Sequence, residues 1–202
     1  MKKILFNDKY GLTKAVLERR KTQTRRIVPD KLLNEYGHNK FSDKSYELIR
    51  HSPFKVGEEV SIAQSYNDVY EELKCTHGSS SPVTRDFFHK YIQGGRMLVS
   101  NKMFVRADIM PHRIKITSVG FERLQDISEE DCLKEGVIRF SDNEYAVDGI
   151  SIPYSHVGKG LYAQRVFRSA KEAFSVLIDK TCGKGTWERN PWVFVYDFKL
   201  VI

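Results

Sequence analysis

The sequence predicts an α+β fold, and two residue patterns support that prediction. β-branched and apolar residues alternate from Lys115 to Val119 and from Trp192 to Phe198, as is typical of β-strands. Between 170 and 178, apolar residues instead recur at the three-to-four spacing of one helix face. At 202 residues the chain is long enough for a substantial core, so we expect a single domain spanning 1–202 with inserted segments.

Composition favours a folded protein with a polyanionic partner. Lysine and arginine number 33 against 26 acidic residues, which gives a net charge of +7 and a pI near 9.2. No run approaches the roughly 20 apolar residues of a membrane span, and no secretion-type apolar core follows the two N-terminal lysines. We therefore expect a cytoplasmic protein that binds nucleic acid and no membrane; its oligomeric state stays open.

The cysteines indicate a reducing compartment and no metal. Cys75, Cys132 and Cys182 are odd in number and far apart, which does not suit a disulfide framework. Cys75 and His77 form the one close pair of Cys and His, and a zinc site would need two further ligands that the spacing does not supply. We expect neither a metal nor another cofactor.

The first elements are expected in this order. An apolar run, Lys3 to Phe6, predicts an opening strand, and a short amphipathic helix capped by Asn7 or Asp8 should precede Arg19. Residues 29–53 are polar and predict an irregular insertion with one short helix. A turn at 57–59 should then lead into a strand that ends near 66.

The remaining chain contains two further insertions. Residues 67–100 predict a loop and a short helix, whose aromatic side chains either pack against the domain or stack on bases. Ser128 should begin a two-turn helix that ends at Gly136, and 138–166 is rich in turn residues. A longer helix follows Ser169, and an aromatic strand ends the chain.

His112 is either a proton carrier or structural.

Residues Arg19 to Arg26 concentrate five cations and two hydroxyl groups in eight positions. Basic residues at a helix end complement its dipole, but this does not explain Arg25 and Arg26, which lie beyond the helix. In an extended strand Thr22, Thr24 and Arg26 would share one face. Such a face can hold an anion or a nucleobase through oriented donors, although a solvated basic run is the other interpretation.

The same segment carries a family resemblance. Lys21-Thr22-Gln23-Thr24-Arg25-Arg26 resembles the signature of ASCH domains, small β-barrel proteins related to the PUA RNA-binding fold, which usually have glycine where this chain has Arg19. A Met-Pro segment before an Arg-Ile strand, at 110–114, resembles longer phage-associated members, and Asn-Pro-Trp-Val at 190–193 is similar to the family's C-terminal pattern. The resemblance implies a PUA-like mixed β-barrel with short peripheral helices and inserted loops.

The resemblance also implies chemistry. Small bacterial members hydrolyse the amide of N4-acetylcytidine, and Lys21, Thr24 and Glu135 match their Lys, Thr and Glu. A threonine nucleophile needs a base, and a lysine can serve if nearby cations and burial lower its pKa. Substrate or RNA contacts are then expected from five residues, Arg20, Thr22, Arg25, Arg26 and Arg113.

Two alternatives use the same residues or the insertions. A non-catalytic RNA-binding module could use the basic cleft, with the cations on phosphates and Thr24 on a base or sugar edge. A protein-interaction module draws support from the insertions alone. The sequence does not decide between a hydrolase and a binding module, because both functions need the same side chains.

Overall fold

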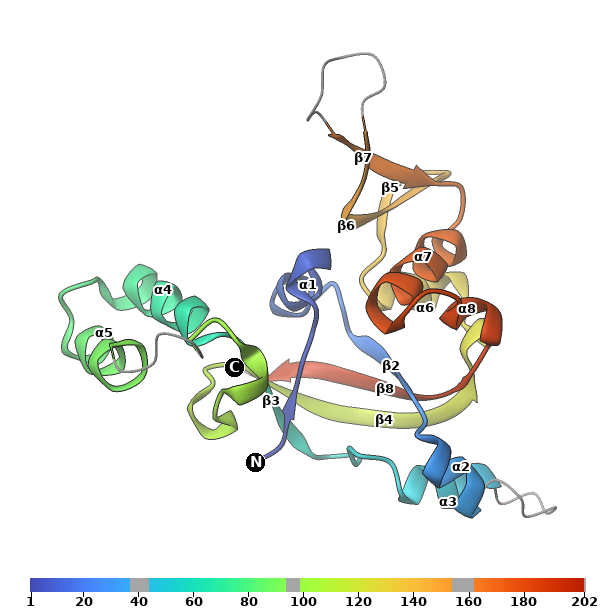
Figure 1. Ribbon diagram of the computed structural model, residues 1–202, viewed down its shortest axis with the longest axis horizontal. Coiled ribbons are helices and arrows are strands. Elements are labelled where there is room, and N and C mark those ends of the chain that lie inside the picture. Colours follow the sequence, from blue (N-terminus) through green and yellow to red (C-terminus); the bar gives the residue numbers. More distant parts are fainter. Residues whose placement is uncertain (37–43, 94–98, 154–161, 202) are drawn as a thin grey trace. The chain divides into compact units, whose positions relative to one another are not determined.

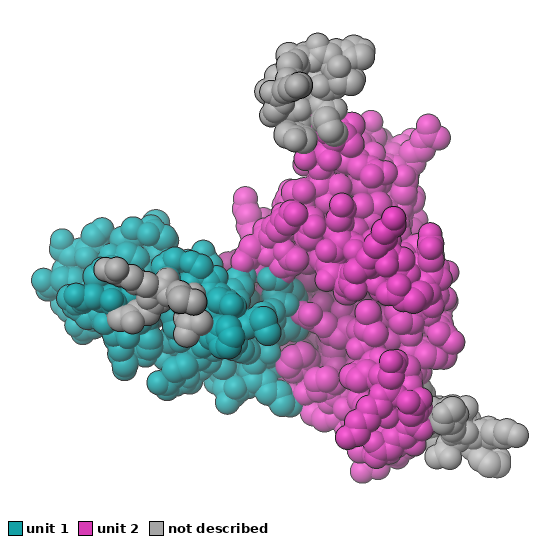
Figure 2. All heavy atoms as spheres, in the orientation of Figure 1, with its two compact units in different colours: residues 1–6, 59–114, 201–202 teal, residues 7–58, 115–200 magenta. Residues whose placement is uncertain are grey.

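The computed structural model describes residues 1–36, 44–93, 99–153 and 162–201. Contacts divide the chain into two compact units (Figure 2). Unit 1 comprises residues 1–6 and 59–114 with the C-terminal end, and unit 2 comprises 7–58 and 115–200. That the chain forms a single domain stays a prediction. No helix in the described residues has the length and apolar character that a membrane crossing requires.

The predicted α+β class is confirmed. One mixed sheet has the strand order β1-β3-β4-β8-β2 (Figure 1). Its strands are β1 (Lys3–Ile4), β2 (Gln23–Ile27), β3 (Glu59–Ile62), β4 (Arg113–Arg123) and β8 (Trp192–Val201). β1 pairs with β3 in parallel, whereas β2 pairs with β8 antiparallel. Within the described residues no closed barrel is formed, so barrel closure remains an expectation.

A second, antiparallel sheet occupies the region predicted as a turn-rich insertion at 138–166. It consists of β5 (Ile138–Ser141), β6 (Glu144–Pro153) and β7 (Tyr162–Phe167), and the residues 154–161 lie outside the described part. Gly149 lets β6 approach the 3-10 helix at Asp8–Tyr10, because a Cβ atom at Gly149 would lie 1.9 Å from the carbonyl oxygen of Lys9. The turn-rich insertion expected at 138–166 is therefore a three-stranded sheet whose strands are joined by those turn residues.

Helices complete unit 2. Their bounds are α1 (Leu12–Leu17), α2 (Asp30–Tyr36), α3 (Lys44–Arg50), α6 (Glu129–Lys134), α7 (Ala170–Cys182) and α8 (Thr186–Arg189). The Ser128 and Ser169 caps are confirmed, since both hydroxyls accept a backbone N–H of the first turn. The predicted cap of α1 is wrong: Asn7 caps the preceding 3-10 helix, and α1 begins after Gly11. In the described residues of segment 29–53 there are two helices, α2 and α3, instead of the one short helix expected.

Unit 1 corrects the expectation for 67–100. The strand β3 ends at Ile62, and Ser65 with Asp68 forms a capping box that starts helix α4 (Tyr66–His77). Helix α5 (Pro82–Phe87) and a π-helical turn (Phe88–Ile92) follow, and residues 94–98 lie outside the described part. Short 3-10 helices at Lys102–Phe104 and Ala107–Ile109 precede β4.

The aromatic residues of this region pack within unit 1. The rings of Tyr66, Phe87 and Tyr91 lie 4.9 to 6.2 Å apart by centroid. Tyr66 and Phe87 contact the buried cluster around Val69 and Met110. Of the two interpretations of these aromatics, packing is therefore the one that their contacts support.

Candidate active site

The turn from α1 into β2 places the basic segment. Arg19 adopts a left-handed conformation with φ of 61°. The N–H of Arg19 bonds to Val16 O and that of Arg20 to Ala15 O, both at 2.9 Å, the hydrogen-bond pair of a Schellman motif. Glycine is the residue that adopts this conformation without strain, so Arg19 occupies a position that favours glycine.

Lys21 is buried at the end of this turn. Its side chain is 2% exposed. The ammonium donates to three oxygens: the carbonyl of Gln23 at 2.8 Å, the carbonyl of Glu135 at 2.7 Å, and Oε2 of Glu135 at 2.6 Å. An ammonium has three N–H donors, so these contacts use its full donor capacity.

Glu135 reaches Lys21 from the C-terminal end of α6. It is the C-cap residue of that helix, and Gly136 follows with φ of 109°, which confirms the predicted helix end. The carboxylate is buried and holds two cations, since Oε1 accepts from Arg25 Nη1 at 3.2 Å while Oε2 accepts from Lys21. Two of the three predicted catalytic residues are therefore in direct contact.

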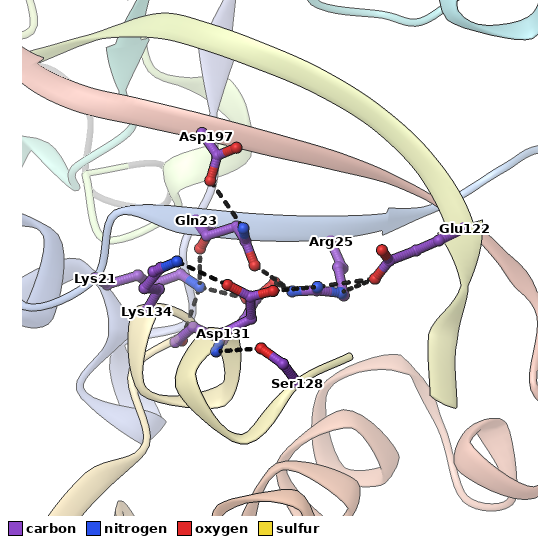
Figure 3. A network of polar contacts seen from close by, with 9 residues as sticks. Lys21, Gln23, Arg25, Glu122, Ser128, Asp131, Lys134 and Asp197 are labelled. Atoms are coloured by element: carbon purple, nitrogen blue, oxygen red, sulfur yellow. Dashed lines mark hydrogen bonds and ion pairs between the residues drawn. The ribbon is translucent and has the colours of Figure 1, made fainter. Parts of the chain in front are cut away.

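Arg25 joins this pair to three further polar side chains (Figure 3). Its Nε and Nη2 donate to Oε1 of Glu122 at 2.9 and 2.8 Å, and Nη2 lies 3.6 Å from Asp131. Its Nη1 also donates to the side-chain oxygen of Gln23, whose amide donates to Asp197 at 2.8 Å. The guanidinium side chain is 1% exposed, so Arg25 acts inside this network and not on the surface.

The surroundings change the acidity of Lys21. Burial lowers the pKa of the Lys21 ammonium below its ordinary value, and the charges of Arg26 and Arg25 add to this effect. Glu135 opposes the shift, because its carboxylate stabilises the charged form. A lysine with a lowered pKa beside a carboxylate at 2.6 Å can exchange a proton with it, which is a property of acid–base sites.

Thr24, the third predicted catalytic residue, lies on the other side of β2. Successive strand residues point to opposite faces, and Gln23 and Arg25 point toward Glu135. Thr24 is buried and pairs with Tyr196 of β8. Within the described residues, no hydrogen bond joins Thr24 to Lys21 or Glu135. Thr24 and Arg26 pair with Tyr196 and Phe194 of β8, two residues apart, so they lie on one face of β2 as predicted.

The predicted binding residues are dispersed. Arg20 is exposed and donates to Glu18 at 2.8 Å, while Thr22 is half buried and bonds through its backbone to Lys134 O. Arg26 is half buried, and burial lowers the pKa of its guanidinium. Arg113 belongs to unit 1, where its guanidinium lies 3.9 Å from Glu59.

Four polar residues of the network were not among the predicted site residues: Gln23, Glu122, Asp131 and Asp197. Gln23 could have been found, because it alternates with Arg25 on one face of β2 and lies two residues after Lys21. Glu122 and Asp197 are brought in by neighbouring strands, and that pairing has no local sequence signal. Asp131 is placed by the helix whose end carries Glu135.

The site shows no metal-ligand set. Within the described residues, no three of the His, Cys, Asp and Glu side chains are arranged to hold a metal ion. In comparisons with known proteins, no family model, curated protein or solved structure matches the chain. The functional argument therefore depends on the geometry of Lys21 and its neighbours.

Proposed function

We propose that this protein acts on RNA or a modified nucleoside and hydrolyses the amide of an N4-acylated cytidine. The proposal includes an ASCH-type, PUA-like fold, which the sequence motif supports, and a cytoplasmic location, which the three widely spaced cysteines support. The observation that carries the chemistry is the buried pair of Lys21 and Glu135, with Nζ and Oε2 2.6 Å apart.

Burying an ion pair is an expensive way to stabilise a fold. The desolvation of two charges often exceeds their mutual attraction, so apolar residues of similar volume would serve stability equally well. Perturbed titratable groups, in contrast, are what acid–base catalysis requires. The buried charges of Lys21, Arg25 and Glu135 are thus better explained by a chemical role than by packing.

The 2.6 Å contact offers a route to a usable base. Lys21 accepts a proton only as a neutral amine, and transfer of one ammonium proton to Oε2 produces that amine together with a neutral Glu135. Burial favours the neutral amine of Lys21. Arg25, 3.2 Å from Oε1, holds this carboxylate in place, and its positive charge lowers the pKa of Lys21 further.

In the proposed reaction, Thr24 Oγ1 adds to the acyl carbon and its proton passes to Lys21 Nζ. The resulting Lys21 ammonium then gives this proton to N4 of cytidine, and the C–N bond breaks. Water hydrolyses the resulting acyl-threonine ester, which releases the carboxylic acid and restores Thr24. Because Thr24 lies on the face of β2 opposite to Arg25, this route requires β2 to rearrange locally when substrate binds, so that Oγ1 comes within reach of Lys21.

The test measures acid release from a panel of N4-acylated cytidines. The parent should release acetate from at least one compound, and Lys21→Arg should not, because guanidinium keeps the charge but supplies no base at working pH. Thr24→Val should abolish turnover and Thr24→Ser should retain part of it. Full activity of Thr24→Val would remove Thr24 as nucleophile while leaving Lys21 under test.

A second candidate is the non-catalytic RNA-binding module. Two observations favour it: all three ammonium donors of Lys21 already have acceptors, and Thr24 lies on the opposite face of β2. The network would then hold β2 against α6 and shape a binding surface. Oligonucleotide binding without turnover of any acylated cytidine would support this function and reject hydrolysis.

A further inference from the structure

We propose that Arg123 is a stacking platform for an unpaired base of single-stranded RNA. The choice of RNA as the ligand rests on the proposed function. The platform is formed by three side chains of β4 and β8 in unit 2. These are Phe121, Arg123 and Trp192.

The three side chains form a layered stack. The rings of Phe121 and Trp192 lie 4.6 Å apart by centroid and are inclined by only 10°. The guanidinium carbon of Arg123 lies 4.2 Å from the centroid of the Trp192 ring. Arg123 is exposed, whereas Phe121 and Trp192 are half buried, so the guanidinium is the layer that remains available to a ligand.

Arg123 is held in place and has no acidic partner. Its Nη1 donates to the carbonyl of Asn190 at 3.1 Å. Asn190 has a left-handed backbone with φ of 45°, and its side chain in turn accepts the N–H of Gln125 at 2.9 Å. Within the described part of the chain no carboxylate pairs with Arg123, whereas the exposed Arg20, Arg50 and Arg106 each pair with one.

An exposed guanidinium that is held over an indole ring suits one kind of ligand. Its outer plane can stack on a nucleobase, and its remaining N–H groups can donate to the adjoining phosphate. An acidic peptide would use the N–H groups but not the plane. The net charge of +7 favours the same anionic, aromatic class of ligand.

The pairing of the strands adds a second cation to this face. Arg26 of β2 is the register partner of Phe194 in β8, and Phe194 lies 6.2 Å from Phe121 by ring centroid. Arg26 therefore shares the sheet face that carries Phe121 and Trp192. Phe194 is buried and Arg26 is half buried, whereas Arg123 is exposed, so Arg123 is the more accessible of these two cations.

The experiment compares a labelled oligouridine octamer with an abasic octamer of equal charge, by fluorescence anisotropy at fixed ionic strength. The parent should bind the abasic octamer about tenfold more weakly, the usual scale of one lost base stack. Arg123→Lys keeps the charge but loses the plane, so it should bind both octamers with nearly equal affinity. Arg139→Lys, another exposed arginine of unit 2, is the matched control and should behave like the parent.

The outcomes separate this inference from the proposed chemistry. Equal discrimination by Arg123→Lys and the parent, no binding of oligouridine by the parent, or equal competition by an octaglutamate peptide would each overturn the platform. Base-dependent binding that Arg123→Lys abolishes would support it even if no acylated cytidine is hydrolysed. Turnover of a free nucleoside by a protein that shows no base-dependent binding would reject the platform and leave the hydrolase intact.

Discussion

Removing the carboxylate of Glu135 should expose how much the fold depends on the buried network. Glu135→Gln leaves the Lys21 ammonium buried, with the carbonyl oxygens of Gln23 and residue 135 as its acceptors but with no negative partner. Breaking a buried ion pair in this way costs about 3–5 kcal/mol, and the two carbonyls place this case near the lower end, about 3 kcal/mol. For a chain of this length, that corresponds to a fall in melting temperature of roughly 6–12 °C.

The opposite substitution should cost less. Lys21→Met leaves Glu135 with Arg25 at 3.2 Å, so no buried charge is stranded, and we expect about 2 kcal/mol. Adding Lys21→Met to Glu135→Gln removes the stranded cation and should raise stability above that of Glu135→Gln alone. Urea unfolding of the parent, both single variants and the double variant measures these differences.

The pH dependence provides a second readout from the same variants. The folded-state pKa of Lys21 lies below its unfolded value of about 10.4, and losing Glu135 removes the main influence that raises it. The unfolded chain therefore binds a proton that the folded chain lacks, and stability increases as pH rises toward about 10. Glu135→Gln should thus be most destabilised at low pH. A double variant less stable than Glu135→Gln, or a pH-independent deficit, would refute the buried-pair reasoning.

Three further predictions concern the backbone turns and the cysteines. Arg19→Gly should stabilise the protein by about 0.5–1 kcal/mol in urea unfolding, because it relieves a left-handed arginine, whereas Arg19→Ala, which keeps the strain, should give no gain. Gly149→Ala should lower the urea midpoint far more than Gly57→Ala. Both glycines have positive φ, but a Cβ at 149 would lie 1.9 Å from Lys9 O, whereas one at 57 would meet nothing within 4 Å. Similar losses in the two variants would argue against the close approach of β6 to Lys9. Burial raises the pKa of Cys132 to about 12, so a thiol reagent at pH 8 should modify Cys75 and Cys182 rapidly and Cys132 only on unfolding, and three equally fast thiols would contradict its burial.

Local sequence patterns predicted much of the fold. The caps at Ser128 and Ser169, the left-handed Gly136 and strand β2 all follow from short-range chemistry, and all are present. The second sheet was missed because its turn residues dominate the composition of 138–166. Helix α4 was missed because polar residues outnumber its one buried residue, Val69.

The candidate site was predicted only in part, because its contacts join residues that are far apart in the sequence. The contact of Lys21 with Glu135 spans 114 positions, and a family motif, not local periodicity, pointed to it. Partners such as Glu122 and Asp197 depend on the pairing of β4, β8 and β2, which residue patterns within one strand do not specify. Conversely, strand alternation alone separates Thr24 from Gln23 and Arg25, and that separation is visible in the register.

The central claim is that Lys21 is a base whose pKa is lowered by burial and by the charges of Arg26 and Arg25, and the pH–rate profile of acetate release tests it most directly. In the parent, kcat/KM should rise through a pKa well below about 10.4. Arg25→Gln removes a positive charge that lowers the pKa of Lys21, so its profile should shift to higher pH, while Arg25→Lys should stay close to the parent. A profile that is flat, or that Arg25→Gln leaves in place, would contradict the assignment of Lys21 as the base.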